Sequence, residues 1–217
     1  MENEIYYEKK EYAINRFRKN AILSLLGSGG KNILDIGCAD GQLGEIIKKE
    51  KGLTVFGIEI SEIACQKAGE KLDRVFCFDV QMPFEKWPDE IKEIRFDGVI
   101  ISEVLEHLFY PENLLGKIKN LLAPSAKIIV TVPNVLFWKN RLKIFFGKFD
   151  YASEGLMDRG HIHFFSWASL REMVKESGYS FVGACHHFPT RGTKWLGKLL
   201  PGLFAYQFIV KIRENEN

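Results

Sequence analysis

The sequence has few cysteines and no long apolar run. Its four cysteines are scattered, without a Cys-x-x-Cys pair or the spacing of a metal site, so we expect no disulfides and a reducing, cytoplasmic location. No apolar stretch reaches the length of a membrane span, and the polar N-terminus lacks a signal-peptide core. We therefore expect a soluble protein.

A strong charge imbalance is also absent. The formal net charge is +2 at pH 7, which is too small to favour a nucleic acid as the partner. With 217 residues, of which 46% are hydrophobic, the chain can bury one sizeable core but leaves little for a second. We expect a single domain over residues 1–217, and no particular oligomeric state is predicted.

Short apolar runs alternate with helical patterns from residue 32 onward. The runs cover residues 32–37, 54–60, 74–80, 96–102 and 126–133, and the helical stretches cover 41–52, 61–72, 85–94 and 111–124. This alternation is typical of a parallel sheet with crossover helices. The sequence predicts an α/β fold: a doubly wound, Rossmann-like, seven-stranded and mostly parallel sheet with an antiparallel edge strand and helices on both faces.

The domain divides into a helical cap, a cofactor-binding core, a substrate-side insertion, and a C-terminal helix with two edge strands. These parts cover residues 1–30, 32–132, 133–165 and 166–217, respectively. In the last part, Ser166 is the expected N-cap of the helix, and the strands fall at 179–188 and 204–213.

The stretch 135–151 within the insertion is aromatic and basic. Trp138, Leu142, Phe145 and Phe146 can share one side of a helix. Three interpretations stay open: a lid that binds the acceptor, an amphipathic helix in peripheral contact with a membrane, and a helix that packs its aromatic side on the domain.

The strongest motif is ILDIGCADGQLG at residues 33–44. A buried strand ends near Asp35, Gly37 and Gly41 permit a tight turn, and a helix begins near Gln42. Such a turn directs backbone N–H groups and the positive end of a helix at a ligand.

Two ligand classes compete for this loop. A nicotinamide cofactor would place its pyrophosphate near Asp35 and Asp40, and each like-charge contact costs about 4 kcal/mol at 4 Å and an effective dielectric of about 20. A ligand with an ammonium group and a sulfonium would instead be attracted. The charge pattern favours the sulfonium.

Carboxylates also follow the next two strands. Glu59 ends the second strand and can accept from ribose hydroxyls, and Asp79 ends the third and can accept from an adenine amino group. A single acidic residue after a strand is usually a turn former. Three of them on one sheet edge favour a nucleoside-binding site.

These motifs, with FDGVIISEVLEHL and GHIHFFSWASLREMVKESGY, resemble those of class I S-adenosylmethionine-dependent methyltransferases, in the small bacterial branch of MetW-like and ubiquinone-biosynthesis-like enzymes. The likeness runs from about residue 32 to 178, with Ala39 in place of a loop glycine. It implies S-adenosylmethionine as cofactor and S-adenosylhomocysteine as product. The implied contacts are Asp35, Gly37, Cys38, Ala39, Gly41, Gln42 and Leu43 with the methionine part, Glu59 and Ile60 with ribose, Asp79 and Val80 with adenine, and Ser102 and Glu103 beneath the sulfonium.

Four titratable residues are candidates for a proton acceptor. Glu106 and His107 follow the fourth strand, and His161 and His163 lie in GHIHFF. A general base accelerates reaction at a hydroxyl by about 10²–10⁴. No third or fourth ligand is placed beside the two later histidines, so no metal is expected.

We expect a methyltransferase that transfers a methyl group to an oxygen atom of a small molecule or of a glycan or lipid precursor. Two alternatives remain: a non-catalytic, MetW-like interaction module, and a nicotinamide-dependent oxidoreductase, which the loop charges disfavour.

Overall fold

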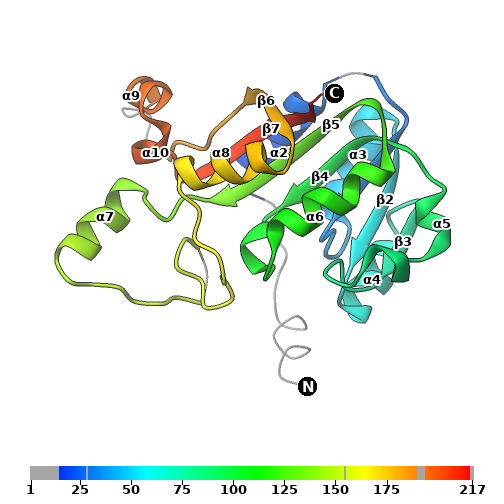
Figure 1. The fold of residues 1–217 in the computed structure, drawn as a ribbon, viewed down its shortest axis with the longest axis horizontal. Helices are drawn as coiled ribbons and strands as arrows, with labels where there is room; N and C mark the ends of the chain where they lie inside the picture. Colours follow the sequence, from blue (N-terminus) through cyan, green and yellow to red (C-terminus); the bar gives the residue numbers. More distant parts are fainter. Residues whose placement is uncertain (1–14, 28, 154, 190–193, 216–217) are drawn as a thin grey trace.

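A seven-stranded sheet forms the centre of the computed structural model, which describes residues 15–27, 29–153, 155–189 and 194–215 (Figure 1). The strand order is β3-β2-β1-β4-β5-β7-β6. The strands are β1 (Asn32–Ile36), β2 (Thr54–Glu59), β3 (Arg74–Cys77), β4 (Phe96–Ser102), β5 (Leu122–Pro133), β6 (Tyr179–Ala184) and β7 (Gln207–Glu214). β1 to β5 are parallel, and β7 runs antiparallel to both β5 and β6.

Helices cover both faces of this sheet. They are α2 (Arg16–Leu26), α3 (Gln42–Lys51), α4 (Glu62–Gly69), α5 (Asp89–Lys92), α6 (Pro111–Ile118), α7 (Trp138–Phe145), α8 (Trp167–Glu176), α9 (Lys194–Leu199) and α10 (Pro201–Phe204), with 3₁₀ turns η1 (Phe84–Lys86), η2 (Leu105–His107) and η3 (Lys119–Leu121). Apolar side chains of α2 and α3 join the core on one face, and those of α5, α6 and α8 join the core on the other.

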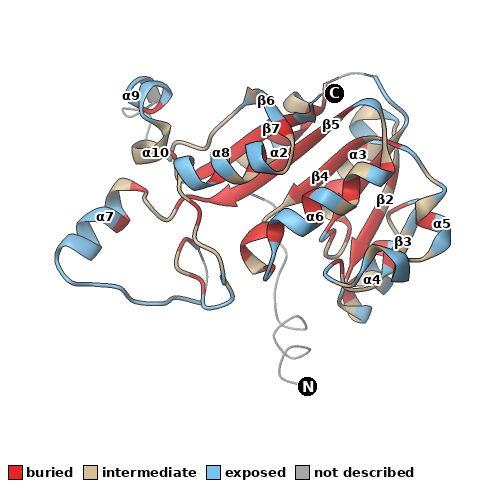
Figure 2. Cartoon of the chain, in the orientation of Figure 1, coloured by how far each residue is buried: buried red, intermediate tan, exposed pale blue. Residues whose placement is uncertain are grey.

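The central strands are apolar throughout because both of their faces are covered. In β4, Val99 and Ile101 belong to one core and Ile100 to the other, and all three are fully buried. Figure 2 shows the same burial across the sheet. Each such side chain stabilises the fold by about 1.5–3 kcal/mol. The predicted fold class is confirmed.

Several predicted elements are shorter than expected, and two of them change the local structure. The helical stretch 85–94 is wrong as one helix: Pro88 separates η1 from the four-residue α5, because proline disfavours helical geometry in the residue before it. The third strand ends at Cys77 instead of continuing to Val80. The helix after Ser166 is confirmed, with Ser166 in a capping box.

The expectation of no disulfides is wrong, because Cys65 and Cys77 form one. Cys65 lies on α4 and Cys77 ends β3, and the crossover between them brings their Cα atoms to 5.9 Å. Cys38 and Cys185 are not disulfide-bonded. The cysteines therefore give no support to a reducing location.

The aromatic and basic stretch 135–151 contradicts one of the three interpretations given for it. Leu142, Phe145 and Phe146 are exposed, so a helix that packs its aromatic side on the domain is wrong for this stretch. Of the helical cap at 1–30, residues 1–14 lie outside the described part. Among the described residues, no helix has the length and apolar character needed to cross a membrane.

Candidate functional site

The loop between β1 and α3 turns at the carboxyl edge of the sheet. Gly37, Ala39 and Gly41 all have positive φ, at 70°, 49° and 79°. Gly37 N and Cys38 N donate to Ile58 O at 2.8 and 3.1 Å, so the turn is tied to β2. A Cβ at Gly37 would come within 2.4 Å of the Val104 side chain. The predicted strand–turn–helix unit is confirmed, at the point where β2 and β4 lie on opposite sides of β1.

Asp35 is the most unusual group of this edge. It is 1% exposed, and neither carboxylate oxygen has a hydrogen-bond partner among the described residues. Burial, followed by repulsion from Glu59, raises the pKa of Asp35 to about 7, although Arg18 opposes the shift. A buried carboxylate without a partner is costly. It therefore suits a cationic ligand group, as the ammonium or sulfonium of S-adenosylmethionine would provide.

Glu59 connects the loop to the end of β2. Its Oε2 accepts from Ala39 N at 2.9 Å, and its Oε1 accepts from Ile60 N and Ser61 N at 2.9 and 3.1 Å. Oε1 thus accepts two hydrogen bonds, whereas Oε2 accepts one and keeps a lone pair for a further donor, so the ribose role stays a prediction. Ile60 itself is exposed.

The charge of Asp40 is compensated by an ion pair with Lys71. Its Oδ2 lies 3.0 Å from Lys71 Nζ and accepts from Gln42 Nε2 at 2.8 Å. The use of Asp40 as a charge against pyrophosphate is therefore wrong, because Lys71 compensates it. The negative charge that disfavours a pyrophosphate here therefore comes from Asp35 and Glu59. Cys38 in the turn and Leu43 in α3 are both buried.

Asp79 forms a turn after β3. Its Oδ1 accepts from Gln81 N at 2.8 Å, which is the ordinary role of a short acidic side chain after a strand. Val80 is buried, and its carbonyl accepts from Lys117 Nζ at 2.9 Å. The second oxygen of Asp79 is not used in this turn, so contact with adenine stays a prediction.

Ser102 and Glu103 end β4 beside β1. Glu103 has φ of 58°, a left-handed conformation that side chains other than glycine rarely adopt. Thr131 Oγ1 donates to Glu103 Oε1 at 2.9 Å, and Arg18 lies 3.4 Å from Glu103 Oε2. The sequence pattern did not single out Arg18 or Thr131, because both come from elements outside the loop motif.

The proton-acceptor candidates meet beyond the end of β4. Glu106 is fully buried in η2, and its carbonyl accepts from Ile162 N and His163 N at 2.8 and 3.0 Å. This pairing holds the GHIHFF segment against η2. The rings of His107 and His161 are 4.9 Å apart.

The structure separates the two later histidines. Ligand atoms of Glu106, His107 and His161 all lie within 4.8 Å of one another and can hold a metal ion. His163 instead places its Nε2 3.0 Å from Phe109 O. The premise that no further ligand lies beside these histidines is therefore wrong: two come from η2. Because His107 and His161 are 54 positions apart in the sequence, the local spacing of residues does not predict that their rings meet.

Two features favour proton acceptance in this cluster. His107 Nδ1 lies 2.8 Å from Gly160 O; since a carbonyl only accepts, Nδ1 carries the proton and a neutral ring keeps Nε2 as an acceptor. Burial, followed by the charge of His107, lowers the pKa of His161. His161 is therefore neutral near pH 7.

The chain is similar in sequence to curated methyltransferases. The curated ubiquinone biosynthesis O-methyltransferase of Pseudomonas fluorescens Pf-5 is 30% identical over 128 residues, which cover 58% of this chain and 54% of that protein. The chain thus spans about half the length of the curated relatives it matches. Residues 7–183 match the methyltransferase-domain family.

Solved structures share the fold. A methyltransferase from Archaeoglobus fulgidus superposes with a TM-score of 0.60 at 19% identity, covering 92% of this chain and 91% of that one. Magnesium protoporphyrin IX methyltransferase from Synechocystis PCC 6803 gives 0.62 at 17%, covering 98% and 94%. The family does not support the oxidoreductase alternative. The chain belongs to the class I S-adenosylmethionine-dependent methyltransferases, through their methyltransferase-domain family.

Proposed function

We propose that the protein transfers a methyl group from S-adenosylmethionine to an oxygen atom of a small molecule or of a glycan or lipid precursor. The observation that carries this proposal is the unpartnered carboxylate of Asp35 at one sheet edge with Glu59. Beyond β4 on the same edge stand two histidines suited to accept a proton. The name of the Pseudomonas relative supports oxygen as the acceptor atom.

The cofactor would supply an electrophilic methyl carbon on its sulfonium. Asp35 would hold the cationic part of the cofactor, and Glu59 would hold the ribose. His107 would take the proton of the acceptor hydroxyl at Nε2, with Gly160 O fixing the ring. His161 would assist as its neutral neighbour. Alignment of the reacting atoms accounts for much of the rate in such displacements.

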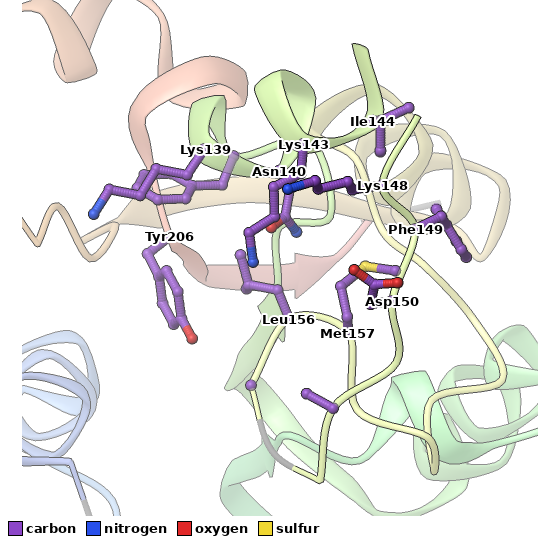
Figure 3. A pocket seen from close by; sticks show the side chains of 13 residues that line it. Lys139, Asn140, Lys143, Ile144, Lys148, Phe149, Asp150, Leu156, Met157 and Tyr206 are labelled. Carbon is purple, nitrogen blue, oxygen red and sulfur yellow. The ribbon is translucent and has the colours of Figure 1, made fainter. Parts of the chain in front are cut away.

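The insertion offers a place for the acceptor. A hollow of about 280 Å³ lies between α7, Tyr206 and residues 148–150, 152 and 155–157 (Figure 3). Tyr206, which directly precedes β7, lines this hollow, and burial, then the charge of Glu103, raises its pKa. Its lining is apolar at Phe137 and Leu156 but carries Lys143. We assign it to a partly apolar acceptor.

A second proposed use of this cluster rests on the closeness of Glu106, His107 and His161. These three residues would bind a divalent cation, which would lower the pKa of an acceptor hydroxyl. A chelator separates the two uses. Proton acceptance by His107 alone survives the treatment, whereas a metal-assisted reaction is lost and returns when the cation is added back.

The test is an assay with methyl-labelled S-adenosylmethionine and a panel of phenolic, lipid and glycan hydroxyl compounds, with products identified by mass spectrometry. Label on oxygen supports the proposal, and label on nitrogen or carbon contradicts it. Cofactor binding without turnover on any acceptor class would favour the non-catalytic interaction module.

A further inference from the structure

The segment after the start of α7 exposes an unusual amount of apolar surface. Every residue from 141 to 153 is exposed, and Figure 2 shows this segment projecting from the body. Phe145 is 82% and Phe146 71% exposed. We use the name α7 face for the large apolar residues here: Leu142, Ile144, Phe145, Phe146, Phe149 and Tyr151. Contiguous apolar surface of this kind marks an interaction site.

Cations are interleaved with the α7 face. Lys139, Arg141, Lys143 and Lys148 are all exposed, and no acidic residue occurs from Trp138 to Phe149. Figure 3 shows Lys143 and Lys148 near Ile144 and Phe149 along this segment. Basic residues beside aromatic ones are the composition of segments that lie at a lipid headgroup boundary.

A second exposed apolar segment lies at the same end of the molecule. On α9 and just after it, Trp195 is 73% exposed, and Leu199 and Leu200 are exposed as well. Arg141 donates to Gly202 O at 3.3 Å, so α7 is tied to α10, which follows this segment. Figure 1 shows α7, α9 and α10 together beyond the end of β5.

The α7 face continues to the candidate site. The rings of Phe149 and Tyr151 lie 6.3 and 6.5 Å from that of Phe164, which lies 6.4 Å from the ring of His161. A surface bound at the α7 face would therefore lie beside the acceptor hollow.

We propose that the α7 face and the α9 segment bind the surface of an anionic lipid bilayer. The aromatic and leucine side chains enter the headgroup boundary, and the four cations contact lipid phosphates. Charge complementarity selects this occupant. A symmetric contact between two copies would instead bring the same four cations together across the two-fold axis, where they repel. This inference goes beyond the proposed function and does not depend on it.

The test is co-sedimentation with vesicles of phosphatidylcholine alone and of phosphatidylcholine mixed with phosphatidylglycerol. We expect binding to the mixed vesicles that weakens as salt is added. Phe145→Ser with Phe146→Ser, and separately Lys143→Glu with Lys148→Glu, should each lower the partition coefficient about tenfold or more.

Matched controls lie elsewhere on the chain. Val182→Ser removes an exposed apolar residue of β6, and Lys67→Glu with Lys175→Glu reverses two exposed cations on α4 and α8. These should bind vesicles as the wild type does, and calorimetric binding of S-adenosylmethionine should be retained in every variant. The proposal is overturned if the wild type ignores anionic vesicles, or if the α7 variants bind equally well. It is also overturned if those variants lose only a self-association seen by sedimentation equilibrium.

Discussion

The carboxylate of Glu59 acts on Asp35 by charge repulsion while it fixes the loop through Ala39 N at 2.9 Å. One acidic residue is thus held by backbone donors, and its neighbour is left buried without a partner. The pair concentrates negative charge where the loop glycines admit a ligand closely. A cationic ligand group relieves this repulsion. Binding therefore recovers free energy that the burial of Asp35 beside Glu59 costs in the free protein.

Cofactor binding should depend on pH through Asp35. Because its pKa of about 7 in the folded protein exceeds the ordinary 3.8, the free protein carries a proton there below neutrality. A cationic ligand favours the ionised form, so affinity should rise from about pH 6 to about pH 8, with proton release on binding. Calorimetry in buffers of different ionisation enthalpy measures that release. Equal affinity at both pH values would contradict this role.

Asp35→Asn should act in opposite directions on stability and binding. The raised pKa means that the folded state holds a proton more firmly than the unfolded chain, so this carboxyl costs stability as the pH rises from about 4 to 7, and fully above 7. The variant should therefore be up to about 4 kcal/mol more stable at pH 8, because each unit between a pKa of 3.8 and one of about 7 is worth about 1.4 kcal/mol. It should also bind S-adenosylmethionine at least about tenfold more weakly. Denaturant unfolding with and without cofactor measures both.

Ala39 should be a site of backbone strain. Its φ of 49° lies in the left-handed region, where glycine is favoured. Ala39→Gly should raise the free energy of unfolding by about 0.5–1 kcal/mol. The control is Ala168→Gly in the exposed first turn of α8, which should lower it. If both substitutions destabilise the protein, Ala39 is not strained.

The Cys65–Cys77 disulfide should be detectable by counting thiols. Under denaturing conditions without a reductant, two thiols should react, and four should react after reduction. Its 12-residue separation predicts a loss of about 3 kcal/mol of stability when the bridge is reduced. Four reactive thiols before reduction would show that the bridge does not form.

His107 should affect the chemical step more than His163 does. His107→Gln should lower kcat by about 10²–10³ with little change in cofactor affinity, because it removes the proton acceptor. His163→Gln, whose ring contacts Phe109 O, is the matched control and should lower kcat far less. Equal losses of kcat in the two variants would indicate that both histidines have structural roles.

Local patterns explain what the sequence predicted well. Apolar runs predict strands that are buried on both faces, as Val99 and Ile100 are. The spacing of Gly37 and Gly41 predicts the turn between β1 and α3. The predictions that failed concern features that depend on tertiary contacts. No spacing shows that Lys71 pairs with Asp40, or that the segment with His161 folds back onto Glu106. The exposure of Phe145 could not be predicted either, because an aromatic side of a helix can pack in the core or lie on the surface.

The most direct test of the central claim is parallel calorimetric titration with S-adenosylmethionine, S-adenosylhomocysteine and NADH. The wild type should bind the first two with micromolar affinity and should not bind NADH, and Glu59→Gln should weaken binding at least about tenfold. Binding of NADH alone, or of none of the three, would contradict the assignment of this edge to S-adenosylmethionine.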